Sequence, residues 1–453
     1  MSKLFGSSGV RGLVNDALTP QLASKIGSAV ATYSKAKKAV VARDTRLSGL
    51  MLQEALVAGL TAAGTNVSLL GVVPTPALAY LTMALRADVG FMLTASHNPP
   101  EYNGIKIFSV DTLSYTEQNQ NAVEQIITCN SYNLADWRSV GKTRSVDVSD
   151  GYVEMLRQAA ALRKPWRVVV DPGCGATFNV APAALKALGC KVTTLNAHPD
   201  GYFPARKSEP TAESLADLAS TVKTLGADLG VAFDGDGDRV AFIDEDGAFA
   251  DFDRLLAAYA AHLLKKRGGG NIVTTVEASM CVETMAERHK GKVAERTKVG
   301  DIYVSEAVKR HRAVFGGEPC GAWVHPRFHF CPDGPLSAVL VMQALEEENK
   351  SLREFIAEVP RYVTLRENIA CPNELKYKIV SRIEKTIAAT FGSGELSTVD
   401  GVRLSLKNGW LLIRASGTEP LIRLTVEGES LKVAQDIMSR GAEMVKREVG
   451  DAA

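Results

Sequence analysis

Short apolar runs alternate with helical stretches along most of this 453-residue chain. Residues 40–44 form an apolar run that ends in Asp44, residues 51–63 have helical periodicity and stop before Gly64, and residues 67–70 are a second apolar run. Alternation at this spacing is typical of α/β folds, in which helices connect the strands of one sheet. Ligand sites in such folds lie in the loops beyond the strand ends, so those loops are where we look for function.

The strand-and-helix pattern restarts twice and then changes. A polar stretch at residues 130–150 precedes a new strand at 166–171, and the glycine-rich residues 267–270 precede another at 271–276. After Pro360 the apolar residues alternate as in half-buried antiparallel strands, and a helix closes the chain. The pattern predicts three α/β domains over residues 1–150, 151–250 and 251–362, and a smaller α+β domain over residues 363–453.

Composition excludes several classes of function. Lys and Arg total 52 against 51 for Asp and Glu, so the chain lacks the basic surplus typical of nucleic-acid or membrane-surface binding. The seven cysteines include no C-x-x-C pair, which argues against a disulfide framework and favours a reducing compartment. We find neither a signal-peptide pattern nor a membrane-spanning length of apolar residues. We therefore expect a cytoplasmic protein with neither nucleic-acid nor membrane partners, whereas monomer and homo-oligomer both stay open.

Ser96 follows the apolar run of residues 88–94, where a strand is expected to end. A serine before Pro99 normally indicates a solvated turn. Its position beyond a strand of an α/β scaffold also suits a hydroxyl that is presented to a ligand. The sequence indicates a nucleophile here only if other segments supply a metal and a grip for phosphate.

The strongest local signal is D-G-D-G-D-R at residues 234–239, directly after the apolar run of residues 227–233. Asp234, Asp236 and Asp238 alternate with glycines that permit a tight turn, and hard oxygen donors of this kind suit Mg²⁺. An acidic surface turn is the plain alternative. An EF-hand would need a bidentate glutamate about twelve residues into the loop, where the sequence has strand and turn instead. We predict a metal site.

Two further loops carry polar groups in patterns that leave alternatives open. Residues 414–420, R-A-S-G-T-E-P, offer a guanidinium, two hydroxyls and a glycine that an anion can approach, but an ordinary strand-to-turn connection fits as well. Residues 316–321, G-G-E-P-C-G, either present Glu318 to sugar hydroxyls or form only a turn. Cys320, His325, His329 and Cys331 would supply four N and S donors, although their spacing fits no common zinc site.

Cationic side chains stand close to these loops in the sequence. Residues 5–12, F-G-S-S-G-V-R-G, have the composition of a flexible tail, but Arg11 could reach a phosphate. Lys106 follows Ser96 by ten residues, and Arg239 follows the acids directly. Each of these cations is an ordinary surface charge unless the Ser96 loop and the loop of residues 234–239 meet in the fold.

Five of these segments together resemble one family, the α-D-phosphohexomutases. FGSSGVRG, TASHNP, DGDGDR, GEPCG and RASGTEPLIR stand in the family's order, one or two in each expected domain. The resemblance covers the whole chain. It implies four domains, three of related α/β fold and a C-terminal α+β domain, around a central cleft.

The resemblance also implies roles for individual residues. Ser96 would carry a covalent phosphate, and one Mg²⁺ per chain would be bound by that phosphate and by Asp234, Asp236 and Asp238. Lys106 would be the general acid/base. The other implied site residues are Arg11, His97 and Arg239 in catalysis, Asn98, Asp301, Glu318 and Cys320 in substrate binding, and Arg414, Ser416, Gly417, Thr418 and Arg423 in a distal phosphate loop.

The implied reaction interconverts the 6-phosphate and 1-phosphate of a hexose or hexosamine. Phosphoserine 96 would donate its phosphoryl group, and a hexose 1,6-bisphosphate would turn end for end as intermediate and activator. The fourth-domain loop is similar to the glucosamine-phosphate branch of the family, and the GEPCG loop and residues 297–301 are most similar to its archaeal members. Glucosamine 6-phosphate is therefore the expected substrate, and glucose or mannose phosphates are the alternative.

Two positions and two other functions remain open at this point. The family usually has serine where Cys320 stands and often histidine near Asp301, so both positions bear on sugar choice. A metal-dependent phosphatase and a non-catalytic sugar-phosphate sensor are the competing functional classes. The sequence does not say how Ser96 first acquires its phosphate.

Overall fold

The computed structural model describes residues 4–147, 149–417 and 419–450. These residues form two compact units. The first unit combines Met1–Phe252 with Gly300–Ile356, and the second combines Asp253–Val299 with Ala357–Ala453. Residues 251–362, expected as one domain, are therefore shared between the two units.

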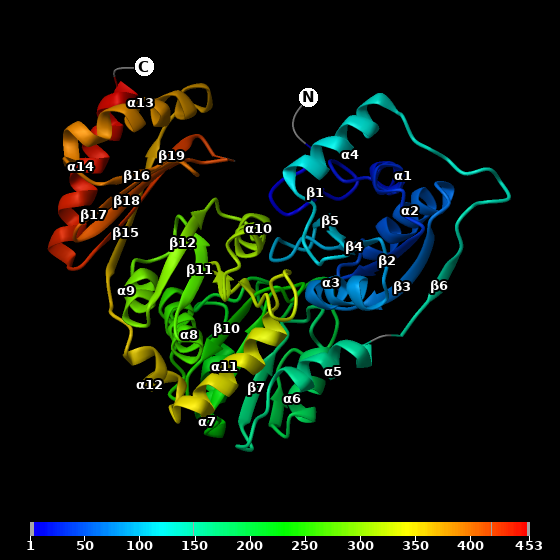
Figure 1. The fold of residues 1–453 in the computed structure, drawn as a ribbon, viewed down its shortest axis with the longest axis horizontal. Coiled ribbons are helices and arrows are strands. Elements are labelled where there is room, and N and C mark those ends of the chain that lie inside the picture. Colours follow the sequence, from blue (N-terminus) through cyan, green and yellow to red (C-terminus); the bar gives the residue numbers. More distant parts are fainter. Residues whose placement is uncertain (1–3, 148, 418, 451–453) are drawn as a thin grey trace. The chain divides into compact units, whose positions relative to one another are not determined.

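The first sheet of the first unit has six strands in the order β1-β5-β4-β2-β3-β6 (Figure 1). Neighbours β4, β2, β3 and β6 are parallel, whereas β5 is antiparallel to both β1 and β4. The strands are β1 (Val10–Leu13), β2 (Lys38–Arg43), β3 (Asn66–Val72), β4 (Val89–Leu93), β5 (Tyr102–Ser109) and β6 (Thr143–Ser145), and the helices are α1 (Pro20–Ser34), α2 (Gly49–Ala62), α3 (Thr75–Ala84) and α4 (Glu117–Cys129).

Local sequence explains how this first layer forms. The side chain of Thr19 accepts the backbone N–H of Leu22 and so caps α1, which continues with Pro20 in its first turn. Helices α1 and α2 pack closely, because a Cβ at Gly59 would lie 2.0 Å from the Ser24 carbonyl oxygen. All five residues of β4 are buried, as a strand covered on both faces requires.

A second sheet in the first unit has the order β10-β9-β7-β8. Strands β8, β7 and β9 are parallel, and β10 runs antiparallel to β9. Residues 234–239, which carry the three aspartates and are called the acid loop below, form the turn between β9 and β10. The strands are β7 (Arg167–Asp171), β8 (Lys191–Thr194), β9 (Leu229–Phe233) and β10 (Val240–Ile243), and the helices are α5 (Ser149–Ala159), α6 (Val180–Ala187) and α7 (Ala216–Leu225).

The remaining part of the first unit contains a short antiparallel pair and two longer helices. Its elements are α10 (Asp301–His311), β13 (Phe315–Gly317), β14 (Trp323–Val324), α11 (Gly334–Glu348) and α12 (Leu352–Ala357), the last ending at the unit boundary.

The second unit combines a parallel strand pair with an antiparallel sheet of order β15-β19-β18-β17-β16. Helices α13 and α14 contribute Ile383 and Ile437 to the core on this sheet (Figure 1). A smaller apolar cluster joins Val276, Trp410 and Leu412. The elements are α8 (Phe252–Arg267), β11 (Gly270–Thr275), α9 (Cys281–Arg288), β12 (Gly291–Thr297), β15 (Val363–Ala370), α13 (Asn373–Phe391), β16 (Glu395–Ser397), β17 (Val402–Leu406), β18 (Gly409–Ala415), β19 (Leu421–Gly428) and α14 (Leu431–Gly450).

The expected α/β architecture with a C-terminal α+β domain is confirmed, with two local differences. Residues 10–13, in the segment whose composition resembles a flexible tail, form β1 because their backbone pairs with β5. Residues 143–145, in the expected polar boundary, form β6 and extend the first sheet beside β3. None of the described helices is long and apolar enough to cross a membrane.

Candidate active site

Ser96 lies just after β4, and its side chain points at the acid loop. Its Oγ donates a hydrogen bond to Asp234 Oδ2 at 2.7 Å, and the residue is only 1% exposed. Its backbone has φ of 52°, in the left-handed region, which costs a non-glycine residue about 1–2 kcal/mol. Surrounding contacts must stabilise this conformation, as is common at functional sites. The Ser96 loop and the loop that carries Asp234 therefore meet.

The three aspartates of the acid loop converge on one point. Asp234, Asp236 and Asp238 are all buried, and one ligand atom from each lies within 4.8 Å of the others. Asp236 Oδ1 and Asp238 Oδ1 are buried without a hydrogen-bond partner among the described residues. Unpartnered buried carboxylate oxygens are costly, and a hard cation such as Mg²⁺ would satisfy them. The acidic triad therefore fits a metal ion.

Lys106 reaches the same carboxylates from β5. Its Nζ lies 2.8 Å from Asp236 Oδ2 and 2.6 Å from Asp238 Oδ2. Burial alone would lower the pKa of Lys106, but these two carboxylates outweigh it and raise that pKa above its usual value. Burial likewise works to raise the pKa of Asp236, and the Lys106 ammonium overcomes this and lowers it. The lysine is thus a fixed cation beside the triad.

His97, Asn98 and Arg11 form further contacts close to Ser96. The Nδ1 atom of His97 is 3.3 Å from Ser96 Oγ, and Arg11 Nη1 donates to Asn98 Oδ1 at 3.1 Å. Burial, followed by the charges of Arg239 and Arg11, lowers the pKa of His97 to about 3. His97 is therefore a neutral imidazole at physiological pH.

Glu318 belongs to residues 316–321, called the sugar loop below, and lies beside the start of α10. Glu318 is 6% exposed, and its Oε1 accepts the backbone N–H of Gly300 at 2.8 Å. Asp301, the next residue, accepts a hydrogen bond from Ser8 Oγ at 2.8 Å. Burial, with a further contribution from Asp301, raises the pKa of Glu318 to about 7. A carboxyl group that titrates near neutrality is a recurrent feature of functional sites.

Arg239 connects the acid loop to the sugar loop. Its backbone forms an antiparallel bridge with Ala322, and the N–H of Val240 donates to the Gly321 carbonyl at 3.1 Å. The backbone N–H of Arg239 also donates to Asp234 Oδ1 at 3.2 Å. Burial raises the pKa of the nearby Cys320 thiol to about 12, against the opposing effect of Arg239, so the thiol is uncharged.

The four nitrogen and sulfur donors near the sugar loop do not form a zinc site. His325 Nε2 lies 2.8 Å from Ser337 Oγ, and His329 Nε2 lies 2.9 Å from Asp333 Oδ2. Within the described part of the chain, the aspartate triad is the one group of three or more His, Cys, Asp or Glu side chains whose ligand atoms converge. The two histidines contribute to internal hydrogen bonding.

The expected distal phosphate loop lies in the second unit. Arg414 Nη1 pairs with Glu277, and Nη2 lies 2.9 Å from Asp400 Oδ2. Ser416 is 4% exposed, and its Oγ accepts the backbone N–H of Glu419 at 3.1 Å. No described atom lies within 4 Å of a Cβ added at Gly417, which leaves space beside that backbone.

Arg423 and Thr418 are the two remaining members expected in the distal phosphate loop. Arg423, on β19, is half exposed and forms an ion pair of 2.7 Å with Glu419. Thr418 lies outside the described residues. Arg414 and Arg423 stand opposite each other in the β18–β19 register.

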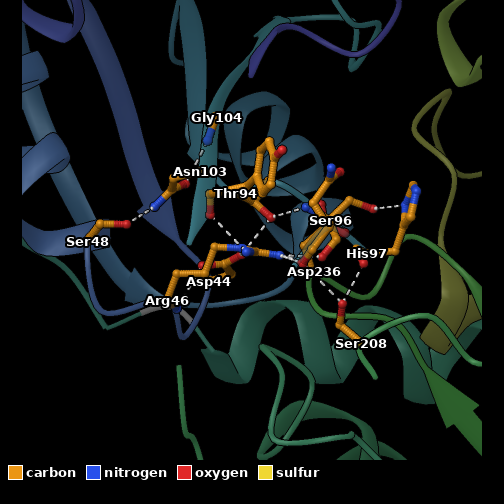
Figure 2. Close-up of polar contacts among 12 residues, drawn as sticks. Asp44, Arg46, Ser48, Thr94, Ser96, His97, Asn103, Gly104, Ser208 and Asp236 are labelled. Carbon is orange, nitrogen blue, oxygen red and sulfur yellow. Dashed lines mark hydrogen bonds and ion pairs between the residues drawn. The ribbon is translucent and has the colours of Figure 1, made fainter. Parts of the chain in front are cut away.

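Several residues that contact the site were not singled out in the sequence. Figure 2 shows Asp44 and Arg46 beside the Ser96 loop, and Ser208, whose Oγ donates to the His97 carbonyl at 2.7 Å. Thr75 Oγ1 donates to Asp236 Oδ2 at 2.5 Å. Asp44 and Arg46 follow β2, so the rule that ligands gather beyond the strand ends could have identified them.

The family models that match the chain cover nearly all of it. They are the phosphoglucomutase/phosphomannomutase alpha/beta/alpha domains I, II and III at residues 2–133, 150–247 and 251–362, and the C-terminal domain at residues 367–444.

Full-length relatives agree with this match. A probable phosphoglucosamine mutase of Methanopyrus kandleri is 42% identical over 99% of this chain and 98% of its own. Another, from Methanothermobacter thermautotrophicus, is 42% identical over 99% of both chains. The solved structure of a phosphoglucomutase/phosphomannomutase family protein from Burkholderia thailandensis has a TM-score of 0.89 at 28% identity, covering 99% of this chain and 98% of that one.

Proposed function

Because the chain belongs to the phosphoglucomutase/phosphomannomutase family, we propose that it is a phosphohexomutase that interconverts glucosamine 6-phosphate and glucosamine 1-phosphate. The observation that carries the proposal is the 2.7 Å contact of Ser96 Oγ with Asp234 in a triad with two unpartnered carboxylate oxygens. A hydroxyl so placed would hold its phosphate against a bound metal. The names of the archaeal relatives support glucosamine as the sugar.

In this proposal Asp234, Asp236 and Asp238 hold Mg²⁺ together with the phosphate on Ser96. The metal would offset negative charge on the transferring phosphoryl group, the main demand of such reactions. The Ser96 Oγ–P bond breaks as a bond forms from phosphorus to the free sugar hydroxyl. Lys106, which is cationic at rest, donates a proton to Ser96 Oγ as that bond breaks and takes the proton of the sugar hydroxyl in return, so that it acts as general acid/base.

The remaining site residues are assigned either to catalysis beside the nucleophile or to substrate binding. Neutral His97 and the Arg11–Asn98 pair border the nucleophile, and Arg239 provides charge beside the acids. Asp301, Glu318 and Cys320 are assigned to the sugar, and Arg414, Ser416, Gly417, Thr418 and Arg423 are assigned to the phosphate that is not reacting.

A grip without metal suits the distal phosphate, since the hexose 1,6-bisphosphate must turn end for end and present either phosphate to Ser96. The residues assigned to the two grips belong to different compact units of the chain. We place the enzyme in the cytoplasm and retain the four-domain division at residues 150, 250 and 362.

A comparison of kcat/KM for the 1-phosphates of glucosamine, glucose and mannose tests the proposal. Glucosamine 1-phosphate is expected to be the best substrate of the phosphorylated enzyme. A clear preference for glucose or mannose would replace the sugar assignment but keep the reaction class. Release of free phosphate at the rate of substrate loss, without isomerised product, would instead identify a phosphatase, and absence of phosphate on Ser96 would favour a sensor.

A further inference from the structure

The guanidinium of Arg46 is buried behind the Ser96 loop with every donor used. Arg46 is 1% exposed, and its Nε donates to Asp44 Oδ2 at 3.0 Å. Its Nη2 donates to the Ser96 and Asn98 carbonyls at 2.9 and 2.6 Å, and its Nη1 to those of Pro99 and Tyr102 at 2.5 and 2.8 Å. All five N–H groups of the side chain thus have acceptors, three of them in the loop that carries the nucleophile and one at the first residue of β5.

The same network reaches the other side of the Ser96 peptide unit. Thr94 Oγ1 donates to Asp44 Oδ2 at 2.7 Å and accepts the backbone N–H of Ser96 at 2.8 Å. Asp44 and Thr94 are fully buried. One carboxylate therefore orients both the guanidinium that holds the Ser96 carbonyl and the hydroxyl that holds the Ser96 N–H (Figure 2).

These contacts explain how Ser96 keeps its left-handed backbone. A φ of 52° is unfavourable for a non-glycine residue and needs support from its surroundings, and Arg46 and Thr94 hold the two peptide groups that flank Ser96 Cα. Without them the backbone would relax to an ordinary conformation. Ser96 Oγ would then lose its direction toward Asp234. The hydrogen bonds of Arg46 go to Asp44 and to backbone carbonyls rather than to Ser96 Oγ or the acidic triad, so it acts through the backbone.

We propose that Arg46, locked by Asp44 and linked through Thr94, is the positioning residue that aims Ser96 Oγ at the acidic triad. The inference rests on the proposed function for its kinetic consequence. Lysine cannot replace this arginine, because an ammonium has three donors on a point charge and cannot span four carbonyls and a carboxylate. The planar fork of the guanidinium is what the loop requires.

Matched threonine variants separate positioning from general stability. T94V removes the hydroxyl that holds the Ser96 N–H, whereas T94S retains it. T65V is the control, since Thr65 is equally buried in the same domain and donates its hydroxyl to the Ala36 carbonyl at 2.8 Å, away from the Ser96 loop. R46K is a further variant, and the threonine set decides the question should R46K fail to fold.

Each protein is phosphorylated with hexose 1,6-bisphosphate, its phosphoserine content is measured by intact mass, and a single turnover with glucosamine 6-phosphate is followed by rapid quench. Misplacement of the oxygen by about 1 Å can cost on the order of a hundredfold in rate. We expect T94V and R46K to lose at least about tenfold in transfer rate per phosphorylated chain, with KM unchanged within about twofold. T94S and T65V should keep the wild-type rate. A T94V rate equal to that of T65V would overturn the inference.

A second reaction separates this inference from the proposed function. If wild-type phosphoserine does not transfer to the sugar, the mutase proposal fails, and phosphorylation of Ser96 by acetyl phosphate then decides the positioning role. Slower labelling of T94V than of T65V, with S96A as the unlabelled reference, would support it. Equal labelling would refute it.

Discussion

Glu318 gives a prediction in which removing a charged site residue stabilises the protein. Glu318 is 6% exposed, and burial raises the pKa of its carboxyl group from 4.5 to about 7. In the unfolded chain the group ionises near its ordinary pKa. Between these two pH values the folded protein retains a proton that the unfolded chain has released. Stability from this group therefore falls as pH rises from 4.5 to 7, and the full cost of burying the carboxylate is present above pH 7.

The difference between these pKa values corresponds to about 3 kcal/mol at about 1.36 kcal/mol per pK unit, as an upper limit. Glutamine has nearly the same shape and can still accept the Gly300 N–H. E318Q should consequently raise the melting temperature of the metal-free protein at pH 8 by a few degrees, because about 1 kcal/mol moves Tm by a few degrees in units of this size. Most of this gain should disappear at pH 5.

Scanning fluorimetry of both proteins in EDTA at pH 5 and pH 8 measures this effect. E213Q is the control, since Glu213 is exposed in the same unit and the same substitution there should change Tm equally at both pH values. In contrast, mutase activity of E318Q should fall if Glu318 binds sugar hydroxyls as proposed, because its carboxylate is lost. A Tm gain of E318Q that is independent of pH, or a loss at pH 8, would show that burial of this carboxylate is not the cause.

Three further substitutions test separate parts of the site. E277Q frees Arg414 from one carboxylate and should tighten inorganic phosphate binding by up to about fivefold, as expected for a partly exposed ion pair, whereas calorimetry showing equal or weaker binding would contradict this. T75V removes the hydrogen bond to Asp236 and should raise the Mg²⁺ concentration for half-maximal activity by about 10- to 100-fold, and an unchanged Mg²⁺ titration would rule the contact out as an orienting one. Y152F leaves the buried Asp333 carboxylate without the Tyr152 hydroxyl and should destabilise the first unit by about 1–3 kcal/mol with unchanged kcat, so a loss of kcat would give the tyrosine another role.

The sequence predicted the chemistry of the first unit better than its supporting contacts. Ser96 and Asp234 each follow an apolar strand, and the rule that polar groups gather beyond strand ends was sufficient to mark both. The prediction that Ser96 meets Asp234, and that Lys106 approaches two of the acids, depended on family resemblance. These residues are more than a hundred positions apart in the sequence. No local pattern specifies such separations.

Other features depend on tertiary packing alone. The presence of a serine at position 96 does not predict its positive φ, since serine favours ordinary turns. The contacts of Arg46 and Thr94 with the flanking peptide groups support this conformation. The pairing of Arg414 with Glu277 likewise joins segments 137 positions apart. Composition does not reveal either that Val276 packs with Trp410, because that contact joins segments far apart in the chain.

The identity of the phosphate carrier is the central claim, and one pulse-chase measurement tests it most directly. Wild-type protein is loaded with phosphate from hexose 1,6-bisphosphate, freed of small molecules and mixed with glucosamine 6-phosphate, and its intact mass is followed with S96A beside it. The account predicts that wild type loses the mass of one phosphoryl group as glucosamine 1,6-bisphosphate forms in equal amount, and that S96A never acquires that mass. Bisphosphate formation by S96A, or loss of the protein phosphate to water alone, would contradict it.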